Sequence, residues 1–210
     1  MPTSGDNTCG PYYPGKKAFT LIELLIVVAI IAILAAIAVP NFLEAQVRAK
    51  VSRCKSDIRT LKTGLESYYV DHNSYILDIN GMPSHPLYNP DDEYVTWTQL
   101  TTPIAFLTSI PFSAFQNNEP QYDNVPWSDQ IVYEYWGPGF WEAANLTVVP
   151  RQLGIFYVVG ALGPNLKRDN LLVTPTEYLN LQRGRAKIYD PSNGTISEGD
   201  ILTSNKVSFY

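Results

Sequence analysis

The segment from Leu21 to Val39 constrains this chain more than any other feature. It reads LIELLIVVAIIAILAAIAV and contains one polar residue, Glu23. A helix rises about 1.5 Å per residue, so this segment would extend about 28 Å, which matches the hydrocarbon core of a bilayer. A soluble core rarely needs a helix that is apolar on every side. The segment therefore predicts a membrane-spanning helix, with a buried core helix as the alternative.

The charges that flank this segment predict its orientation. Lys16 and Lys17 precede it, and the next positive residue is Arg48. The positive-inside rule then places the N-terminus in the cytoplasm and the rest of the chain across the membrane. A secretory signal peptide fits less well, because its apolar run is usually about 7–15 residues long and ends at an A-x-A-like site. Here the run is longer and ends in AVPN.

Glu23 is the most informative single residue of the segment. A carboxylate in hydrocarbon is costly, so it is expected to have a partner or a route to water. Glu23 lies near the cytoplasmic edge, from which it can reach the interface. The alternative is a pairing with a positive group at the start of a neighbouring subunit's helix.

The stretch GKKAFTLIELLIVVAIIAILAAIAVPNF resembles the N-terminus of type IV pilins and type II secretion pseudopilins. In that family a prepilin peptidase removes a short basic leader after a small residue and methylates the new amino terminus. The resemblance implies a leader over residues 1–18, cleavage between Ala18 and Phe19, and methylation of Phe19. The family usually has glycine before the cut, so alanine at this position predicts slower cleavage.

The resemblance also implies how the mature helix, residues 19–39, would assemble. The amino group freed at Phe19 would neutralise Glu23 of an adjacent subunit in a filament of bundled apolar helices. An uncompensated buried carboxylate is expensive, so this pairing would favour the filament. Pro40 removes a backbone donor and predicts a bend or a locally melted stretch. It is the second residue expected to act in assembly, with a simple kink as the alternative.

Residues 40–72 change from uniformly apolar to periodic. Charged residues alternate with an apolar stripe at steps of four and three, which predicts an amphipathic helix. The polar residues at 71–74 are a plausible end for it. The stripe consists of Val47, Val51, Cys54, Ile58, Leu61, Leu65 and Tyr68.

Charge and cysteine content narrow the function further. The net charge of −5 argues against a nucleic-acid partner held by a basic face. Removing the leader takes the net charge to −6, because the leader holds two lysines and Asp6. The basic helix after residue 40 and the acidic remainder could then interact between stacked subunits, or simply be solvated. Cys9 lies in the leader and Cys54 on the stripe, so the mature chain has no intrachain disulfide. Many type IV pilins have one near the C-terminus, which favours the pseudopilin branch.

Residues 73–210 predict a globular head in which proline and glycine are frequent. Strand-like runs cover 131–136, 155–160 and 186–189, and a short helix is expected within 97–106. Residues 79–130 are expected to form an enlarged loop region. The fold class is therefore α+β, with a long N-terminal helix packed on a small antiparallel sheet of three or four strands, the pilin fold.

Several segments, among them Leu162–Asn165, resemble the G-type or major pseudopilins. In that group the C-terminal loop often binds calcium, which takes six to eight oxygen ligands. The resemblance implies a possible calcium site, and the alternative is two turns that join short strands. The residues that could supply its oxygens are Asp190, Asn193, Thr195, Glu198 and Asp200.

Templates for catalysis are absent from the sequence: it contains no GxSxG, HExxH, CxxC or GxxxxGK[ST] motif. We therefore expect a structural protein rather than an enzyme. The resemblance implies a subunit of a type II secretion pseudopilus, with its head in the periplasm and its helix first in the inner membrane. It also implies other pseudopilins, an assembly platform and a cytoplasmic ATPase as partners. The alternatives are a type IV pilin of a surface pilus and, more remotely, a membrane-anchored enzyme or receptor.

Overall fold

The computed structural model describes residues 19–79, 82–87, 94–115, 133–140, 152, 154–167, 169, 187–193, 197–206 and 208–209. The chain divides into two compact units, Met1–Phe42 and Leu43–Tyr210. The boundary between them falls inside the long helix. The predicted leader over residues 1–18 lies outside the described residues.

Helix α1 (Leu21–His72) contains 52 residues. It ends where Asn73 adopts a left-handed backbone with a φ of 54°. The Asn73 N–H donates to the Tyr69 carbonyl at 2.8 Å, which closes the last turn. Pro40 lies inside the helix without interrupting it, so the predicted locally melted stretch is absent.

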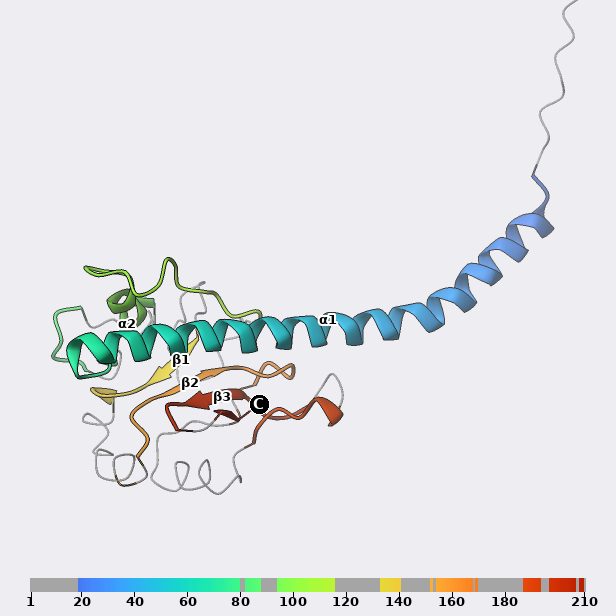
Figure 1. The fold of residues 1–210 in the computed structure, drawn as a ribbon. Coiled ribbons are helices and arrows are strands. Elements are labelled where there is room, and N and C mark those ends of the chain that lie inside the picture. Colours follow the sequence, from blue (N-terminus) through green and yellow to red (C-terminus); the bar gives the residue numbers. More distant parts are fainter. Residues whose placement is uncertain are drawn as a thin grey trace, which may run out of the picture. The chain divides into compact units, whose positions relative to one another are not determined.

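Four short strands form one antiparallel sheet with the order β1-β2-β3-β4. They are β1 (Glu134–Trp136), β2 (Val158–Ala161), β3 (Ile201–Ser204) and β4 (Ser208–Phe209). Tyr135 faces Val159 across the first pair, and Val159 faces Thr203 across the second. Residues 43–72 of α1 lie against this sheet (Figure 1). The predicted α+β arrangement of a long helix on a small antiparallel sheet is confirmed.

Some local predictions are wrong in position. The runs at 131–136 and 155–160 overlap β1 and β2, but the described part of the run at 186–189, residues 187–189, forms no strand. There Ile188 makes an isolated parallel bridge to Asp200 instead. Two backbone hydrogen bonds hold this bridge, from the Tyr189 N–H to the Asp200 carbonyl at 3.0 Å and from the Asp200 N–H to the Lys187 carbonyl at 2.9 Å, and among the described residues they do not continue into a ladder. The short helix also begins earlier than predicted, as α2 (Tyr94–Trp97) continued by η2 (Thr98–Leu100).

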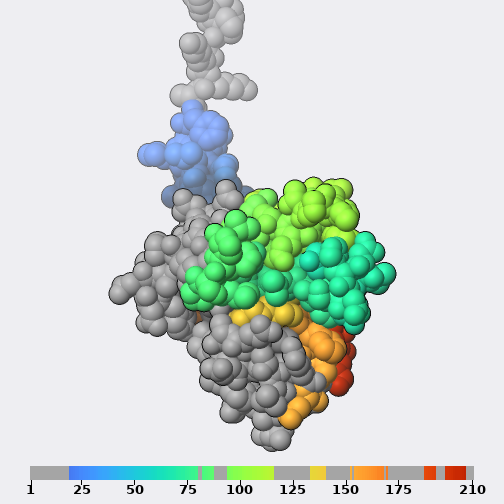
Figure 2. Space-filling model, turned by 90° about the vertical axis from the view of Figure 1, so that its left-hand side faces the viewer, coloured from blue at the N-terminus to red at the C-terminus, as the bar shows by residue number. Residues whose placement is uncertain are grey.

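The core lies between α1 and the sheet. All seven residues of the predicted stripe join it: Val47 and Tyr68 are partly buried, and the other five are buried. The indole of Trp97 is fully buried, donates to the Tyr133 carbonyl at 2.6 Å and meets the Tyr135 ring edge-on at 5.4 Å. Figure 2 shows residues 94–115 against the C-terminal turns of α1, where Phe106 contacts the Tyr68 ring.

Two carboxylates of α1 fix the helix to the head. Asp57 accepts a hydrogen bond from the Tyr133 hydroxyl at 2.8 Å. Glu66 accepts one from Tyr157 at 2.7 Å and another from Tyr75 at 3.1 Å. Burial is the main reason why the pKa values of these three phenols lie above their usual value, and the neighbouring acidic groups raise them further. All three therefore remain protonated donors in the folded chain.

This arrangement predicts loss of stability at alkaline pH. Tyrosines in the unfolded chain release protons above about pH 10, whereas the buried phenols keep theirs. The unfolded state then binds fewer protons, so the free energy of unfolding falls by about 1.4 kcal/mol per pH unit for each such tyrosine. Urea unfolding in detergent at pH 8 to 11 measures this slope. Tyr157→Phe should reduce the slope by the contribution of one tyrosine. An unchanged slope would contradict the prediction that Tyr157 stays protonated in the folded chain.

Candidate functional site

The start of α1 holds Glu23 in a reciprocal capping arrangement. The Thr20 N–H donates to Glu23 Oε2 at 2.9 Å, and the Thr20 hydroxyl donates to the same oxygen at 2.8 Å. In return the Glu23 N–H donates to Thr20 Oγ1 at 3.2 Å. This is the geometry of a capping box, in which the first and fourth residues satisfy each other's unpaired groups. Thr20 was not among the predicted site residues, although the pattern TLIE has the spacing of a capping box.

The capping arrangement fixes where the carboxylate lies. Glu23 Oε2 faces the backbone of Thr20, the residue directly after Phe19. The charge therefore lies at the helix start, close to where an amino group at Phe19 would begin the mature chain. Phe19 is 73% exposed, and Ala18 lies outside the described residues. Glu23 and Phe19 thus lie together at the start of α1, whereas Pro40 lies near the end of the apolar segment.

The apolar segment presents its side chains to the surroundings on all sides. Every large apolar residue from Phe19 to Val39 is between 46% and 85% exposed. The helix is long and apolar enough to cross a membrane. So much apolar surface is unfavourable in water at about 25 cal/mol per Å². The segment therefore requires lipid or the apolar surface of other chains.

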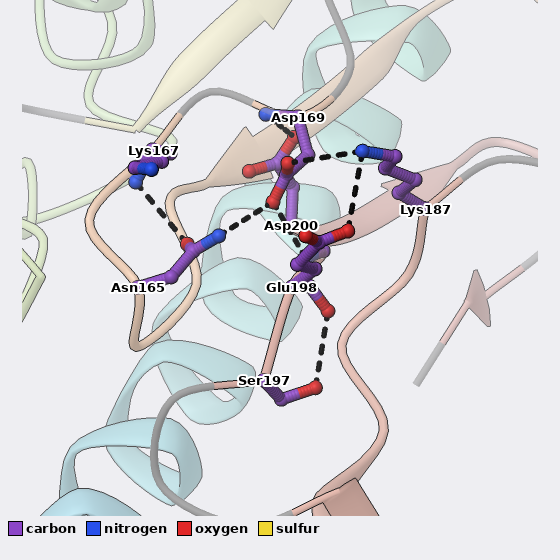
Figure 3. A network of polar contacts seen from close by, with 8 residues as sticks. Asn165, Lys167, Asp169, Lys187, Ser197, Glu198 and Asp200 are labelled. Carbon is purple, nitrogen blue, oxygen red and sulfur yellow. Dashed lines mark hydrogen bonds and ion pairs between the residues drawn. The ribbon is translucent and has the colours of Figure 1, made fainter.

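A second polar cluster joins two parts of the head near the C-terminus (Figure 3). The Asp169 carboxylate accepts from the Gly199 N–H at 2.6 Å and from Asn165 Nδ2 at 2.8 Å. The Asp169 N–H donates to Asp200 Oδ2 at 3.1 Å. Lys187 Nζ lies 3.2 Å from Glu198 and 3.7 Å from Asp169, and these carboxylates raise its pKa. The cluster therefore links residues 165–169 to residues 187–200.

The predicted calcium ligands are only partly brought together. Glu198 and Asp200 belong to the cluster of Figure 3. Asp190 instead accepts the Ser192 N–H at 2.8 Å, a hydrogen bond that lowers the pKa of its carboxyl group. The side chain of Asn193 and the whole of Thr195 lie outside the described residues. Within the described part of the chain, no group of three or more metal-ligating side chains converges. The calcium site stays a prediction.

Sequence reasoning missed Asp169, which lies far from the predicted loop along the chain, and also Lys187, which lies just before that loop. The signal available was Gly163, because a Cβ there would lie 2.0 Å from the Gly199 carbonyl oxygen. Only glycine at position 163 lets the two backbones come this close. A single sequence, however, does not show which distant segment will pack against that glycine.

The comparisons with known proteins concern the N-terminal segment. Residues 14–39 match a family described as the prokaryotic N-terminal methylation motif. The type IV major pilin protein PilA of Myxococcus xanthus is 48% identical over 64 residues, 30% of this chain and 29% of that protein. The N-terminal segment of this chain thus carries the prepilin-type methylation motif and is similar to the corresponding segment of type IV pilins and pseudopilins.

Relatives on both sides of this family match the same chain. A fimbrial protein of Pseudomonas aeruginosa is 56% identical over 52 residues, 25% of this chain and 34% of that protein. The type II secretion system core protein G of Pectobacterium carotovorum is 34% identical over 71 residues, 34% of this chain and 46% of that protein. The chain thus spans less than half the length of these relatives. No solved structure matches it.

The methylation motif of this chain contains the residues of the predicted cleavage and charge pairing. Ala18, Phe19 and Glu23 all lie within the matched segment, and Pro40 follows directly after it. Most of the head lies beyond the aligned lengths of these relatives.

Proposed function

We propose that this chain is a structural, non-enzymatic subunit of a type II secretion pseudopilus. The observation that carries the proposal is the start of α1: an apolar segment exposed on all sides that holds a single carboxylate, within a prepilin methylation motif. An isolated soluble enzyme has no use for such a surface. In a subunit that moves from lipid into a helical bundle, the same apolar surface contacts lipid before assembly and the helices of other subunits after it.

Cleavage after Ala18 would act as the trigger for this transfer. While the leader is attached, the nitrogen of Phe19 is an uncharged amide and cannot balance Glu23. Cleavage creates an ammonium group, and its pairing with the Glu23 carboxylate of an adjacent copy removes the cost of two buried charges. Assembly would therefore follow processing by a prepilin peptidase and fix the axial position of each subunit.

The partners and location follow from the same proposal. The subunit waits in the inner membrane with its N-terminus in the cytoplasm and its head in the periplasm. A platform protein and a cytoplasmic ATPase drive its polymerisation with further copies and other pseudopilins. Growth of the filament then pushes exported proteins through an outer-membrane channel.

The cysteine content supports the secretion branch. Cys54 is fully buried in the stripe and is a free thiol, and the sequence has one other cysteine, Cys9, in the predicted leader. The mature subunit therefore has no disulfide to brace a head displayed outside the cell.

A surface pilus is the second candidate, and the relatives named as pilins support it. PilA and the fimbrial protein are more similar to this chain than protein G over their aligned segments. In this case the same helix start would assemble a fibre for adhesion, motility or DNA uptake.

Deletion of the gene in its own bacterium distinguishes the two candidates. Loss of secreted proteins from the medium, with surface fibres retained, is the expected result for a pseudopilin. Loss of surface fibres with normal secretion would favour the pilin. Normal secretion and normal fibres together would contradict both. Re-expression of the wild-type chain is the control, because it must restore the lost property.

Processing gives a further prediction at Ala18. A peptidase site that accepts glycine and alanine should reject a large side chain, and an added methylene in a tight pocket already costs about tenfold or more in rate. We expect Ala18→Leu to accumulate as precursor and Ala18→Gly to be cleaved at least as fast as wild type. Mass spectrometry of the amino terminus measures both. A methylated terminus other than Phe19 would contradict the assigned cleavage site.

A further inference from the structure

One ammonium group joins three segments in the polar cluster of the head. Lys187 Nζ lies 3.2 Å from Glu198 Oε2 and 3.7 Å from Asp169 Oδ1. Its side chain extends toward both carboxylates, which come from different parts of the chain (Figure 3). We call these three residues the lysine clamp. The clamp thus ties the segment that begins at Lys187 to residue 169 and to the residues just before β3.

The clamp lies where the C-terminal part of the head is fastened to α1. The backbone hydrogen bonds that join Lys187 and Tyr189 to Asp200 lie directly beside it. Tyr189 is 6% exposed and belongs to the same core as Val51 of α1. Burial raises the pKa of the Tyr189 hydroxyl. Opening of the clamp would therefore loosen a segment that contributes to the core.

The oxygens of the cluster indicate which cation it takes. Calcium requires about six to eight oxygen ligands at about 2.3–2.6 Å. Asp169 Oδ2 accepts hydrogen bonds from the Gly199 N–H and from Asn165 Nδ2, so both of its lone pairs are occupied. Asn165 Oδ1 accepts from the Lys167 N–H at 3.1 Å, and Asp200 Oδ2 accepts from the Asp169 N–H at 3.1 Å. Oxygens that bind N–H groups in this way do not fit a calcium site.

The charge of Lys187 opposes a divalent cation at the same place. The neighbouring carboxylates of Glu198 and Asp169 raise the pKa of Lys187, so the ammonium form persists at neutral pH. A calcium ion bound to either carboxylate would lie within a few ångströms of this ammonium, and the two positive charges would repel. Calcium could bind there only by displacing the ammonium from both carboxylates.

We propose that the Lys187 ammonium is the cation that fastens the C-terminal part of the head, and that this part takes no calcium. The inference goes beyond the proposed function, because it concerns the head of a single subunit and applies to a pseudopilin and a pilin alike. It replaces the calcium site that the sequence suggested by a cation built into the chain. The head should then keep its stability when calcium is removed.

Thermal unfolding of the full chain in detergent tests the calcium part of the proposal without any substitution. Extracellular calcium modules have dissociation constants of about 10⁻⁴–10⁻³ M, so about 10 mM calcium would nearly fill such a site and raise the melting temperature by several degrees. We expect calcium and EGTA to give melting temperatures within about 1 °C of each other. Magnesium at the same concentration is the control for general salt effects. A rise of several degrees with calcium alone would overturn the proposal.

Lysine variants test the role of the ammonium. K187M removes the charge and keeps the length of the side chain, which is 57% exposed, so the core stays packed. We expect hydrogen–deuterium exchange at the Gly199 and Asp200 N–H groups to become about fivefold faster or more. K187R keeps the charge and should stay within about twofold of wild type. The matched control K167M neutralises an exposed lysine outside the clamp and should also stay within about twofold.

The outcomes separate the charge of Lys187 from its shape. Equal exchange rates in K187M and K167M would show that the ammonium does not hold the segment, and would overturn the proposal. Exchange in K187R as fast as in K187M would show that the shape of lysine matters rather than its charge, and would overturn it as well. If K187M does not fold, the comparison of calcium with EGTA in the wild-type chain and the exchange rates of K187R still decide.

Discussion

Replacing Glu23 by alanine is expected to abolish filament assembly while membrane insertion remains intact. In the filament the variant would leave the amino group of each Phe19 buried without a counter-charge, and breaking a buried ion pair in this way costs about 3–5 kcal/mol. At about 1.4 kcal/mol for each factor of ten, this corresponds to a loss of about 10²- to 4 × 10³-fold in the assembly equilibrium for each contact. Insertion into lipid would become easier, because the variant segment contains no charge.

The capping arrangement at Thr20 makes a sharper control necessary. Alanine at position 23 removes both the charge and the hydrogen bonds to Thr20, and loss of a helix cap alone costs about 0.5–2 kcal/mol. Glu23→Gln keeps an oxygen that can accept from the Thr20 N–H but carries no charge. Thr20→Val removes the hydroxyl and keeps the charge. If charge pairing drives assembly, Glu23→Gln should fail as completely as alanine, and Thr20→Val should still assemble.

Yield is measured by shearing filaments from cells or spheroplasts, and insertion by membrane fractionation of the same cells. Filaments from Glu23→Gln at the wild-type level would contradict charge pairing and leave capping as the role of the residue. If the alanine variant also forms filaments, neither charge pairing nor capping by Glu23 is needed for assembly.

The contrast between the two ends of the chain shows what a single sequence can predict. The helix was predictable, because both of its halves have a local pattern: a long run of apolar residues and then a stripe at steps of four and three, together spanning the 52 residues of α1. The capping box was equally local, and its signal lay in four consecutive letters. These features depend on neighbours in the sequence and need no knowledge of the fold.

The head was less predictable because its determinants are distant along the chain. Strands β3 and β4 contain two to four residues each, too few for a periodic signal. The cluster around Asp169 brings together residues some 30 positions apart, and the pairing of Glu66 with Tyr157 joins residues 91 positions apart. Nothing in the identity of an aspartate or a glutamate indicates which distant residue it will bind in the folded chain. The predicted calcium ligands illustrate this, because the loop around Asp200 lies against Asp169 and Lys187.

The second large effect is expected in the core of the head, from Trp97→Ala. Trp97 is fully buried, and its indole N–H donates to the Tyr133 carbonyl at 2.6 Å. Its ring also lies edge-on to Tyr135. Removal leaves a large cavity beneath the sheet and an unpaired carbonyl, and truncations of this kind cost about 3–5 kcal/mol. A domain of this size has a total stability of about 5–15 kcal/mol, so the head would lose a large share of it.

Urea unfolding of the full chain in detergent micelles, followed by near-ultraviolet circular dichroism, measures this loss. Trp97→Phe separates the two contributions, because it keeps much of the aromatic volume and removes the N–H; a cost of about 1–3 kcal/mol is expected for the unsatisfied carbonyl. Val70→Ala is the matched surface control, because Val70 is 80% exposed on the same helix that packs over the core. The free energy of unfolding of this variant should stay within about 0.5 kcal/mol of wild type.

A cost below about 1 kcal/mol for Trp97→Ala would mean that the indole does not hold α2 to the sheet. A full effect combined with normal processing at Ala18 would show that the leader is removed independently of head stability, since the methylation motif and the core lie in different units of the chain.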